Sequence, residues 1–308
     1  MKIVALAGGT GAAKFLRGLC QVTDPAAVTV IGNTGDDLEM WGLSVSPDLD
    51  TVMYTLAGVV DATRGWGLSG DTFMCRDAIG RLGAVRFFGL GDRDLATHLL
   101  RTEQLRAGLS LSEATEGLCR RFGVKSRILP MSNERVRTRI QTPSGWLAFQ
   151  EFFVRERCAP EVVDIAYDGA AAARPAPGVL EAIGEARCVI VCPSNPISSV
   201  GPILAVPGIR EALSATTARV VAVSPVVGRA AVSGPAGKMM EAKGFEVSAL
   251  GVAAVYGEFL DRLVIDQQDA NLVTLLRARG LEVLLTDSIM DGVDKEKALA
   301  RAVLEGFA

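Results

Sequence analysis

The amino-acid sequence predicts an α/β protein with a Rossmann-like, doubly wound and mainly parallel sheet. Three observations support this fold class. The chain opens with an apolar run, a glycine-rich turn, an amphipathic stretch and a second apolar run. Four further apolar runs follow in the second half of the chain, and the first three of them end in a polar loop. Between these regions the pattern is first helical and then that of a β-hairpin, which indicates an insertion.

The first βαβ unit is expected within residues 1–32. Residues 2–7 and 27–32 are short apolar runs of the kind that form buried parallel strands. Residues 12–21 are expected to form the helix that two consecutive parallel strands require as their connection. The sheet therefore begins at the first residues of the chain.

The middle of the chain is expected to be an insertion. Residues 51–125 show mostly helical spacing of apolar residues, and residues 135–154 alternate polar and apolar around a Pro-Ser-Gly turn, as in a hairpin. The alanine-rich residues 170–176 are expected to form a surface loop. We predict a single domain over residues 1–308, with the helical and hairpin insertion over about 51–165.

The later apolar runs predict the remaining strands of the sheet. They lie within residues 187–196, 219–228, 262–269 and 281–287. The carboxyl ends of parallel strands form the ligand crevice of an open α/β sheet. The loops GGTG, NTGDD, PSNP and SPVVG are therefore expected to converge at one edge.

Composition excludes several classes of protein. The net charge of −3 and the pI near 5.4, without a basic run, argue against a nucleic-acid partner. No apolar stretch approaches the roughly 18–20 residues that span a membrane, and Lys14 and Arg17 interrupt the first apolar region, which argues against a signal peptide.

The cysteine and histidine content predicts a cytoplasmic protein without a histidine-based zinc site. Six scattered cysteines form no CxxC pair, as expected for free thiols in a reducing cytoplasm. His98 is the single histidine, and its apolar helical context favours a packed structural role.

The glycine-rich stretch GGTGAAKF has two interpretations. It lacks the GxxxxGK[ST] pattern, and Lys14 stands where a dinucleotide fingerprint needs its third glycine. It could be a tight strand-to-helix turn. It could also cradle an anion at a helix amino terminus, with Gly8, Gly9, Thr10, Gly11 and Lys14 as contacts.

Four aspartates close to this loop favour the second interpretation. Asp36 and Asp37 follow the second predicted strand, and Asp48 and Asp50 follow soon after. Each could be a turn former or a helix cap. Together they would repel one another without a cation, and Mg²⁺ prefers one or two carboxylates with phosphate oxygens and water. We expect a phosphate-ester or diphosphate site with Mg²⁺.

Three further loops supply candidate ligand-binding side chains, although caps and turns explain the same residues. The candidates are Arg93 within residues 89–98, Ser194, Asn195, Ser198 and Ser199 within residues 193–202, and Lys238 at the end of residues 233–238. The amide of Asn195 both donates and accepts, so it could match a guanine edge. Trp66, between two glycines, is expected either to cover a pocket as part of a lid or to anchor the insertion by packing.

The order of these motifs resembles a known family. The segments are GGTGAAK, NTGDD, SPDLDT, GDTF, LGDRDLATH, ILPMS, PSNPISSVGPIL and SPVVG with VSGPAGK. Over residues 1 to about 270 they are similar to the 2-phospho-L-lactate transferase family of deazaflavin coenzyme F-420 biosynthesis. RGWGLSGDT and FGLGDRDLATHL resemble the actinobacterial type, in which a phosphoenolpyruvate variant occurs.

The resemblance implies a Rossmann-like homodimer that uses a guanylyl diphosphate donor. A phospho-lactyl or phospho-enolpyruvyl group would pass to the ribityl 5′-hydroxyl of the deazaflavin Fo by direct in-line attack, and GMP would leave. The family's Mg²⁺ ligands correspond to Asp36 and Asp50, and its Fo contacts to Asp50 and Gly89. Some members carry lysine at the latter position, so only the backbone of Gly89 could serve here.

The resemblance also divides the donor between loops. The Gly8–Gly11, Ser194–Ser199 and Gly234–Lys238 loops resemble the family's guanosine and phosphate side. We expect the glycine loop and Lys14 to hold phosphate, and Asn195 to contact guanine.

Two alternatives from other classes remain open. One is a nucleotide-binding regulatory protein of the same fold without activity, which the retention of Asp36 and Asp50 disfavours. The other is an NAD(P)-linked oxidoreductase, which the incomplete glycine fingerprint disfavours. The acid carried by the donor (lactate, enolpyruvate or glycerate) also stays open, because such small groups differ by only about 1–3 kcal/mol in an apolar pocket.

Overall fold

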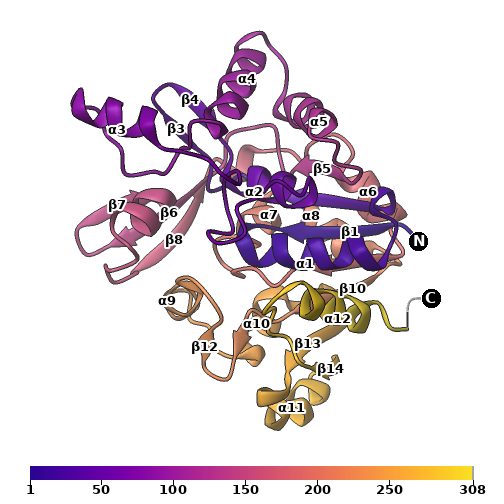
Figure 1. Ribbon diagram of the computed structural model, residues 1–308. Coiled ribbons are helices and arrows are strands. Elements are labelled where there is room, and N and C mark those ends of the chain that lie inside the picture. The colour runs from indigo at the N-terminus through magenta and orange to yellow at the C-terminus, as the bar shows by residue number, and fades with distance from the viewer. Residues whose placement is uncertain (307–308) are drawn as a thin grey trace.

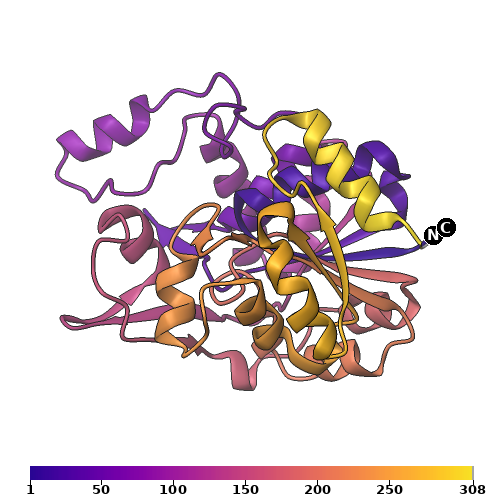
Figure 2. The same ribbon diagram turned by 90° about the horizontal axis from the view of Figure 1, so that it is seen from below.

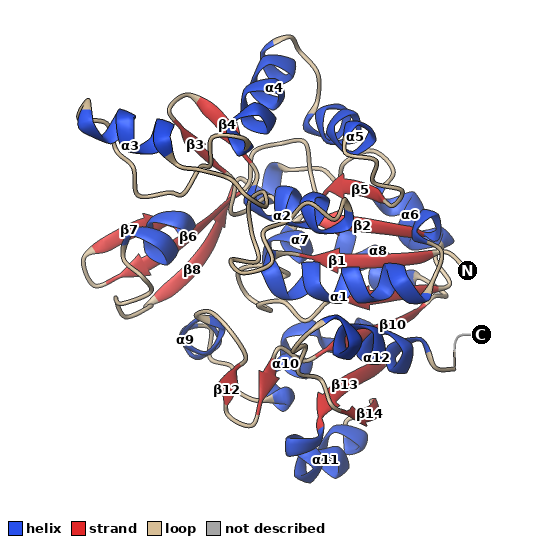
Figure 3. Ribbon diagram, viewed as in Figure 1, coloured by secondary structure: helices blue, strands red, loops and turns tan. Residues whose placement is uncertain are grey.

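A seven-stranded parallel sheet forms the centre of the molecule, which confirms the predicted α/β fold class (Figures 1 and 3). A computed structural model describes residues 1–306. The strand order is β14-β13-β10-β9-β1-β2-β5, and all neighbouring pairs are parallel. The strands are β1 Ile3–Ala7, β2 Val28–Gly32, β5 Arg127–Pro130, β9 Cys188–Val191, β10 Arg219–Val223, β13 Arg262–Asp266 and β14 Glu282–Thr286.

The strand order places a topological switch between β1 and β9. The chain starts in the middle of the sheet at β1, continues outwards to β2 and β5, and then returns to β9 and runs to the opposite edge. Ile3 pairs with Val28 on one side and with Cys188 on the other. The loops that follow β1 and β9 therefore start at adjacent strand ends and lead to helices on opposite faces of the sheet, and such a position is where open α/β sheets bind ligands.

Helices cover both faces of the sheet, and each face has its own apolar core. Alternate residues of β1 point to opposite faces, so Val4 and Leu6 pack into one core while Ile3 and Ala5 pack into the other. Figure 2 shows α12 beside α1 on one side of the sheet. The first face carries α6 Val179–Glu185, α7 Gly201–Ala205, α8 Ile209–Ala215 and α10 Ala249–Tyr256, and the second carries α1 Gly9–Val22, α2 Pro47–Leu56, α5 Leu111–Arg121 and α12 Val293–Leu304.

The remaining elements surround the carboxyl edge of the sheet or connect its strands. A three-stranded antiparallel sheet has the order β7-β6-β8, and two small hairpins pair β3 with β4 and β11 with β12. These strands are β3 Leu38–Met40, β4 Leu43–Val45, β6 Arg137–Thr142, β7 Gly145–Ala148, β8 Asp164–Asp168, β11 Val226–Val227 and β12 Ala230–Ala231. The other helices are α3 Met74–Arg81, α4 Asp94–Arg106, α9 Ala236–Ala242 and α11 Val273–Ala278. Short turns of 3₁₀ helix span Pro25–Ala27, Ala170–Ala172, Gly257–Phe259 and Gln267–Leu272, and a π-helical turn spans Glu151–Arg155.

The structure adds to the sequence prediction at three places. The first helix begins at Gly9 rather than at residue 12, so the glycine loop lies within its first turn. β5 lies within the predicted insertion of about 51–165 but pairs with β2 of the central sheet. The surface loop predicted at 170–176 is wrong in part, because Ala170, Ala173 and Ala176 are buried. Small side chains allow that segment to pack closely against the core.

Within residues 1–306, no helix is both long enough and apolar enough to cross a bilayer.

Candidate functional site

The glycine loop and the loop after β9 meet at the switch point, as the sequence predicts. A Cβ atom at Gly8 would lie 2.7 Å from Asp48 Oδ2 and 2.8 Å from Ser199 Cβ. A Cβ atom at Gly11 would lie 2.4 Å from the carbonyl oxygen of Pro193. Gly9 has a φ of +72°, in the left-handed region that favours glycine. These glycines let two loops approach the backbone at the amino terminus of α1.

A buried pair of carboxylates lies directly beside this turn. Asn33 Nδ2 donates to Asp36 Oδ2 at 3.1 Å, to Asp48 Oδ2 at 2.9 Å and to the carbonyl oxygen of Ser198 at 3.3 Å. Asp36 is 4% exposed and Asp48 is 8% exposed. One amide therefore joins the acidic loop after β2, the first turn of α2 and the loop after β9.

The environment of these carboxylates opposes negative charge. Burial, and then the charge of Asp48, raise the pKa of Asp36 well above its ordinary value. Burial raises the pKa of Asp48 to about 6, although hydrogen bonds from Asn33 and Gly9 oppose the rise. Burial likewise raises the pKa of Asp37 to about 7, against the effects of the Arg137 charge and of the hydrogen bond from Ser46. A site of this kind favours a bound proton or cation.

Asp50 belongs to a different buried network. Arg101 on α4 is fully buried and holds Asp50 in a bidentate ion pair, with Nη1 at 2.9 Å from Oδ2 and Nη2 on Oδ1. His98 Nδ1 lies 3.7 Å from Asp50 Oδ2, and His98 Nε2 lies 3.2 Å from Asp94 Oδ2. Tyr54 donates its hydroxyl hydrogen to Asp94 Oδ1 at 2.6 Å. The expected packed role of His98 thus takes the form of a buried polar contact between two aspartates.

The structure therefore brings Asp36 together with Asp48 rather than with Asp50. Residues two apart on a helix point to nearly opposite sides, so Asp48 faces the glycine turn while Asp50 faces α4. In the part of the chain that the structure describes, no group of three or more His, Cys, Asp or Glu side chains is arranged to hold a metal ion. The shared Mg²⁺ site at Asp36 and Asp50 stays a prediction.

Two further aspartates explain the GDTF and LGDRD motifs as crossed helix caps. Asp71 accepts hydrogen bonds from the backbone N–H groups of Arg93 and Asp94 at 2.7 and 2.9 Å, at the start of α4. Asp92 accepts from the N–H groups of Met74 and Cys75 at 2.9 and 2.8 Å, at the start of α3. These caps join residues 71–75 to residues 92–94. They support the interpretation of the LGDRD segment as a helix cap.

Trp66 lies against Gly89, as part of the same insertion. A Cβ atom at Gly89 would lie 2.9 Å from Trp66 Cη2, so the indole occupies the space next to the glycine backbone. The Arg64 guanidinium lies 5.2 Å from the indole centroid, and Trp66 remains 38% exposed. A Cβ atom at Gly65 would lie 3.7 Å from Thr10 Cγ2, so this loop approaches the glycine turn.

Several predicted ligand-binding side chains have partners within the protein. Arg93 Nη1 donates to the carbonyl oxygen of Ser69 at 2.8 Å. Asn195 Oδ1 accepts from the N–H groups of Ile197 and Ser198, so it fixes its own turn, and its Nδ2 contacts Met239 Sδ at 3.3 Å. These contacts favour the structural interpretation of both side chains.

The two predicted lysines differ from each other. Lys238 Nζ donates to the carbonyl oxygens of Cys158 and Ala159 at 2.7 and 3.3 Å, so its position is fixed by that loop rather than by the glycine turn. Lys14 is exposed on α1 and has no ion pair or side-chain hydrogen bond to any residue between 1 and 306.

Ser194 Oγ is buried and has no hydrogen-bond partner among the described residues.

The sequence prediction missed the β7-β6-β8 sheet as a wall of the site. Thr138 N donates to the carbonyl oxygen of Gly35 at 2.7 Å, and Gln150 Nε2 donates to that of Asp36 at 3.3 Å. Tyr167 donates its hydroxyl hydrogen to the carbonyl oxygen of Ile197 at 2.5 Å. The hairpin was predicted, but nothing in its alternation indicates that it docks on the acidic loop.

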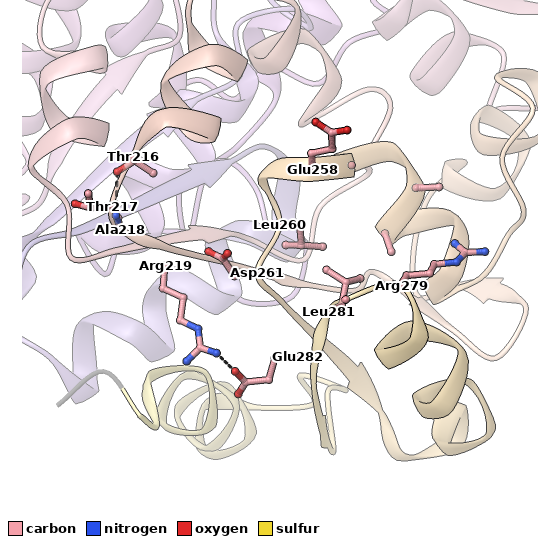
Figure 4. Close-up of a pocket in the computed structure, with 14 residues that line it drawn as sticks. Thr216, Thr217, Ala218, Arg219, Glu258, Leu260, Asp261, Arg279, Leu281 and Glu282 are labelled. Carbon is pink, nitrogen blue, oxygen red and sulfur yellow. Dashed lines mark hydrogen bonds and ion pairs between the residues drawn. The ribbon is translucent and has the colours of Figure 1, made fainter.

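A surface depression lies at the opposite edge of the sheet. It measures about 910 Å³ and is bordered by the amino ends of β10, β13 and β14 (Figure 4). Arg219 within it pairs with Glu282, and Arg279 donates to the carbonyl oxygen of Leu250 at 3.3 Å. None of the predicted site residues lines this depression, so it is separate from the crevice at the carboxyl ends.

Comparison with known proteins identifies the family. Residues 3–304 match the family described as 2-phospho-L-lactate transferase CofD. A phosphoenolpyruvate transferase of Streptomyces griseus is 48% identical over 311 residues, which cover 99% of this chain and 98% of that protein. A 2-phospho-L-lactate transferase of Methanosarcina mazei is 42% identical over 305 residues, which cover 99% of this chain and 100% of that protein.

A solved structure shows the same fold at lower identity. The crystal structure of a UPF0052 family member from Bacillus halodurans superimposes with a TM-score of 0.68 at 19% identity, covering 99% of this chain and 98% of that one. The family model and the two relatives span nearly the whole chain, including the crevice at the carboxyl ends of β1 and β9. This chain therefore belongs to the 2-phospho-L-lactate transferase family, as its motifs predict.

Proposed function

We propose that this transferase moves a phospho-acid group from a guanylyl diphosphate donor to the ribityl 5′-hydroxyl of the deazaflavin Fo. GMP would leave, and a form of coenzyme F-420-0 would be the product. Family membership over residues 3–304 supports this proposal. The structural observation that carries it is the buried Asp36–Asn33–Asp48 group beside the glycine turn. Such a group at a helix amino terminus suits a diphosphate together with a cation.

We propose phosphoenolpyruvate as the acid carried by the donor. The identity of 48% to the phosphoenolpyruvate transferase of Streptomyces griseus exceeds the 42% to the 2-phospho-L-lactate transferase of Methanosarcina mazei. The Gly65–Gly67 stretch, with Trp66 against Gly89, belongs to the segment that resembles the actinobacterial type. The product would then be the dehydro form of the coenzyme.

The residues at the crevice fit a Mg²⁺ ion. Asp36 Oδ1 is buried and has no hydrogen-bond partner in the described chain, so a carboxylate lone pair is available for a ligand. We propose Asp36 as the ligand that this observation supports, with Asp48 next to it as a second source of negative charge. Asp50, the second ligand predicted from the sequence, has both carboxylate oxygens on Arg101 and would reach the ion only if that ion pair opened. Mg²⁺ bound there would neutralise the diphosphate and stabilise the charge on departing GMP.

The protein's own groups would position the two substrates. Backbone N–H groups of the first turn of α1 would hold phosphate oxygens, with Lys14 as a free cation nearby. The Fo hydroxyl oxygen would form a bond to the phosphorus next to the acid while the bond from that phosphorus to the bridging oxygen breaks. GMP would take the electron pair of the broken bond, and the hydroxyl proton would pass to water. Asp50 would orient the ribityl chain, because a carboxylate already paired with Arg101 is a poor proton acceptor.

The proposed reaction also implies where and how the protein works. All six cysteines are free thiols, which supports a reducing compartment such as the cytoplasm. We propose a homodimer, with small molecules as the only substrates and with neither nucleic acid nor membrane as a partner. Size-exclusion chromatography with light scattering would test the dimer directly.

One reconstitution tests the proposed function. Purified protein is incubated with Fo, Mg²⁺, GTP, one phospho-acid and the guanylyltransferase that makes the donor, and the products are measured by mass spectrometry. We expect the dehydro coenzyme with phosphoenolpyruvate, and little product from the Asp36→Asn variant. A folded wild-type protein that binds GMP but makes no product with any phospho-acid would favour the regulatory alternative.

A further inference from the structure

The amino end of β6 brings an arginine to the acidic loop. Thr138 N donates to the carbonyl oxygen of Gly35 at 2.7 Å, which fixes the strand directly beside Asp36. Val136, Thr138 and Ile140 are buried on one side of the strand, so Arg137 lies on the other side. Arg137 is only half buried, and its guanidinium is close enough to Asp37 for the two charges to influence each other's pKa.

The Arg137 guanidinium is a partly buried cation at this crevice. It forms no ion pair with any residue that the structure describes. It makes one hydrogen bond, from Nη1 to the carbonyl oxygen of Val136 at 2.7 Å, and has no carboxylate within ion-pair distance in residues 1–306. By contrast, Arg101 is held by Asp50, and Arg93 donates to Ser69. Burial lowers the pKa of Arg137, against the charge of Asp37. A desolvated cation without a partner costs free energy, which an anionic ligand would offset.

The geometry of the crevice indicates which anion this is. The glycine turn contacts Asn33 and Asp48 from the side of the central sheet, whereas β6 contacts Gly35 from the side of the insertion. The diphosphate of the donor would occupy the glycine turn, so the group beyond the reacting phosphorus would extend towards β6. That group is an acid with a carboxylate, and the planar fork of a guanidinium matches a carboxylate in two parallel hydrogen bonds.

We propose that Arg137 binds the carboxylate of the phospho-acid carried by the donor and thereby selects acid-bearing donors over plain guanine nucleotides. This inference rests on the proposed function and assigns a recognition residue to it. Lysine offers a point charge without the fork, so Arg137→Lys should retain only part of the selection.

The test compares binding of two nucleotides to three proteins. The nucleotides are lactyl diphosphoguanosine, which carries the same carboxylate as the enolpyruvyl donor, and GDP, which lacks the acid. Binding is measured by calorimetry with Mg²⁺ present. Arg137→Met should weaken binding of the acid-bearing donor by about 30- to 4000-fold, the range for removal of one partner of a buried charge pair. GDP should bind to it as to wild type, within about twofold.

A matched control is available two residues away. Arg135 is exposed at the same end of β6, so Arg135→Met removes an equal charge without removing the proposed contact. We expect this variant to bind both nucleotides as wild type does. Thermal unfolding of all variants checks that the fold is retained.

Two outcomes would overturn the assignment, and a third would separate it from the proposed function. An equal loss of donor and GDP in Arg137→Met would mean that Arg137 contacts phosphate. If Arg137→Met binds both nucleotides as wild type does but unfolds at a lower temperature, Arg137 only balances the charge of Asp37. A wild-type protein that prefers the acid-bearing donor in an Arg137-dependent way, yet transfers nothing to Fo, would reject the proposed reaction and retain the contact.

Discussion

The crevice has two walls that are built in different ways. On the side of the central sheet, Asn33, Asp36 and Asp48 are buried and joined by hydrogen bonds to adjacent strand ends. On the side of the insertion, α3 has no buried residue, and the Trp66 indole is partly exposed. The proposed diphosphate would need preorganised N–H groups, together with carboxylates that hold its cation. A site that must admit a flat acceptor and release a product can be more open.

Asp50 and Arg101 connect these two walls. Asp50 lies in the first turn of α2, which packs on the central sheet. Arg101 belongs to α4 of the insertion. Both side chains of this ion pair are buried. We therefore expect changes to the Asp50–Arg101 pair to affect both stability and activity. A change on one wall alone is expected to affect a single property, such as the binding of one substrate.

The largest effect is expected at the connection itself. Asp50→Asn leaves Arg101 buried without a charge partner, which should lower the free energy of unfolding by about 3–5 kcal/mol. Denaturation in urea measures this change. The double variant Asp50→Leu, Arg101→Met is the control, and its loss should be smaller than the sum of the two single losses. An Asp50→Asn variant within about 0.5 kcal/mol of wild type would show that the pair does not join the walls.

A pH-dependent effect is expected from the carboxylates of the sheet wall. Burial raises the folded-state pKa of Asp48 to about 6 and of Asp37 to about 7. The unfolded value is about 4, so the folded state binds more protons between about pH 4 and 7. The free energy of unfolding should therefore fall as pH rises through this window, on the order of 1–3 kcal/mol.

Two controls isolate the carboxylates in that experiment. Asp48→Asn should remove part of the slope, because it removes one of the groups that lose a proton. Added Mg²⁺ should raise the free energy of unfolding of the wild-type protein at pH 7, since a cation that binds only the folded state stabilises that state. Stability that rises with pH over the same window would contradict the account of this wall.

A smaller and more selective effect is expected on the insertion wall. If Trp66 stacks on the deazaflavin, Trp66→Ala should weaken Fo binding by about 5- to 100-fold, the range for one aromatic stacking contact. Quenching of tryptophan emission by Fo should decrease in the same variant. Trp146 on β7 is similarly exposed, so Trp146→Ala serves as the matched control. Equal Fo affinity in both variants would make Trp66 a packing anchor of the insertion.

The smallest effect on recognition is expected at Asn195. Its Oδ1 fixes the turn after β9 through the N–H groups of Ile197 and Ser198. Asn195→Ala should therefore cost about 1 kcal/mol of stability and leave the preference for GMP over AMP unchanged. Competition by the two nucleotides measures that preference. A loss of guanine preference would restore the interpretation that Asn195 contacts the base.

The sequence pattern predicted the sheet wall better than the insertion wall. The first βαβ unit and the loops at the strand ends follow from local periodicity, which a sequence shows directly. β5 was missed because it is a short strand that follows a long helical stretch. The separation of Asp48 from Asp50 could have been predicted, because two helix positions differ by about 200° in direction.

The partners of those aspartates could not have been predicted from the same pattern. Arg101 lies on a separate helix, 51 residues after Asp50. The pattern of apolar residues around it does not indicate that its side chain is fully buried. Likewise, the alternation around Arg137 predicts a strand but not the hydrogen bond that docks it on Gly35. Contacts between elements distant in the chain depend on tertiary packing rather than on local propensity.

One isotope experiment tests the two-walled account most directly. Fo labelled with ¹⁸O at the ribityl 5′-hydroxyl is incubated with wild-type protein, Mg²⁺ and the acid-bearing guanylyl donor, and the products are separated by mass spectrometry. If the insertion wall presents Fo to the phosphorus next to the acid, the label appears in the coenzyme product and none in GMP. A guanylylated Fo, or GMP release without a labelled product, would contradict the account.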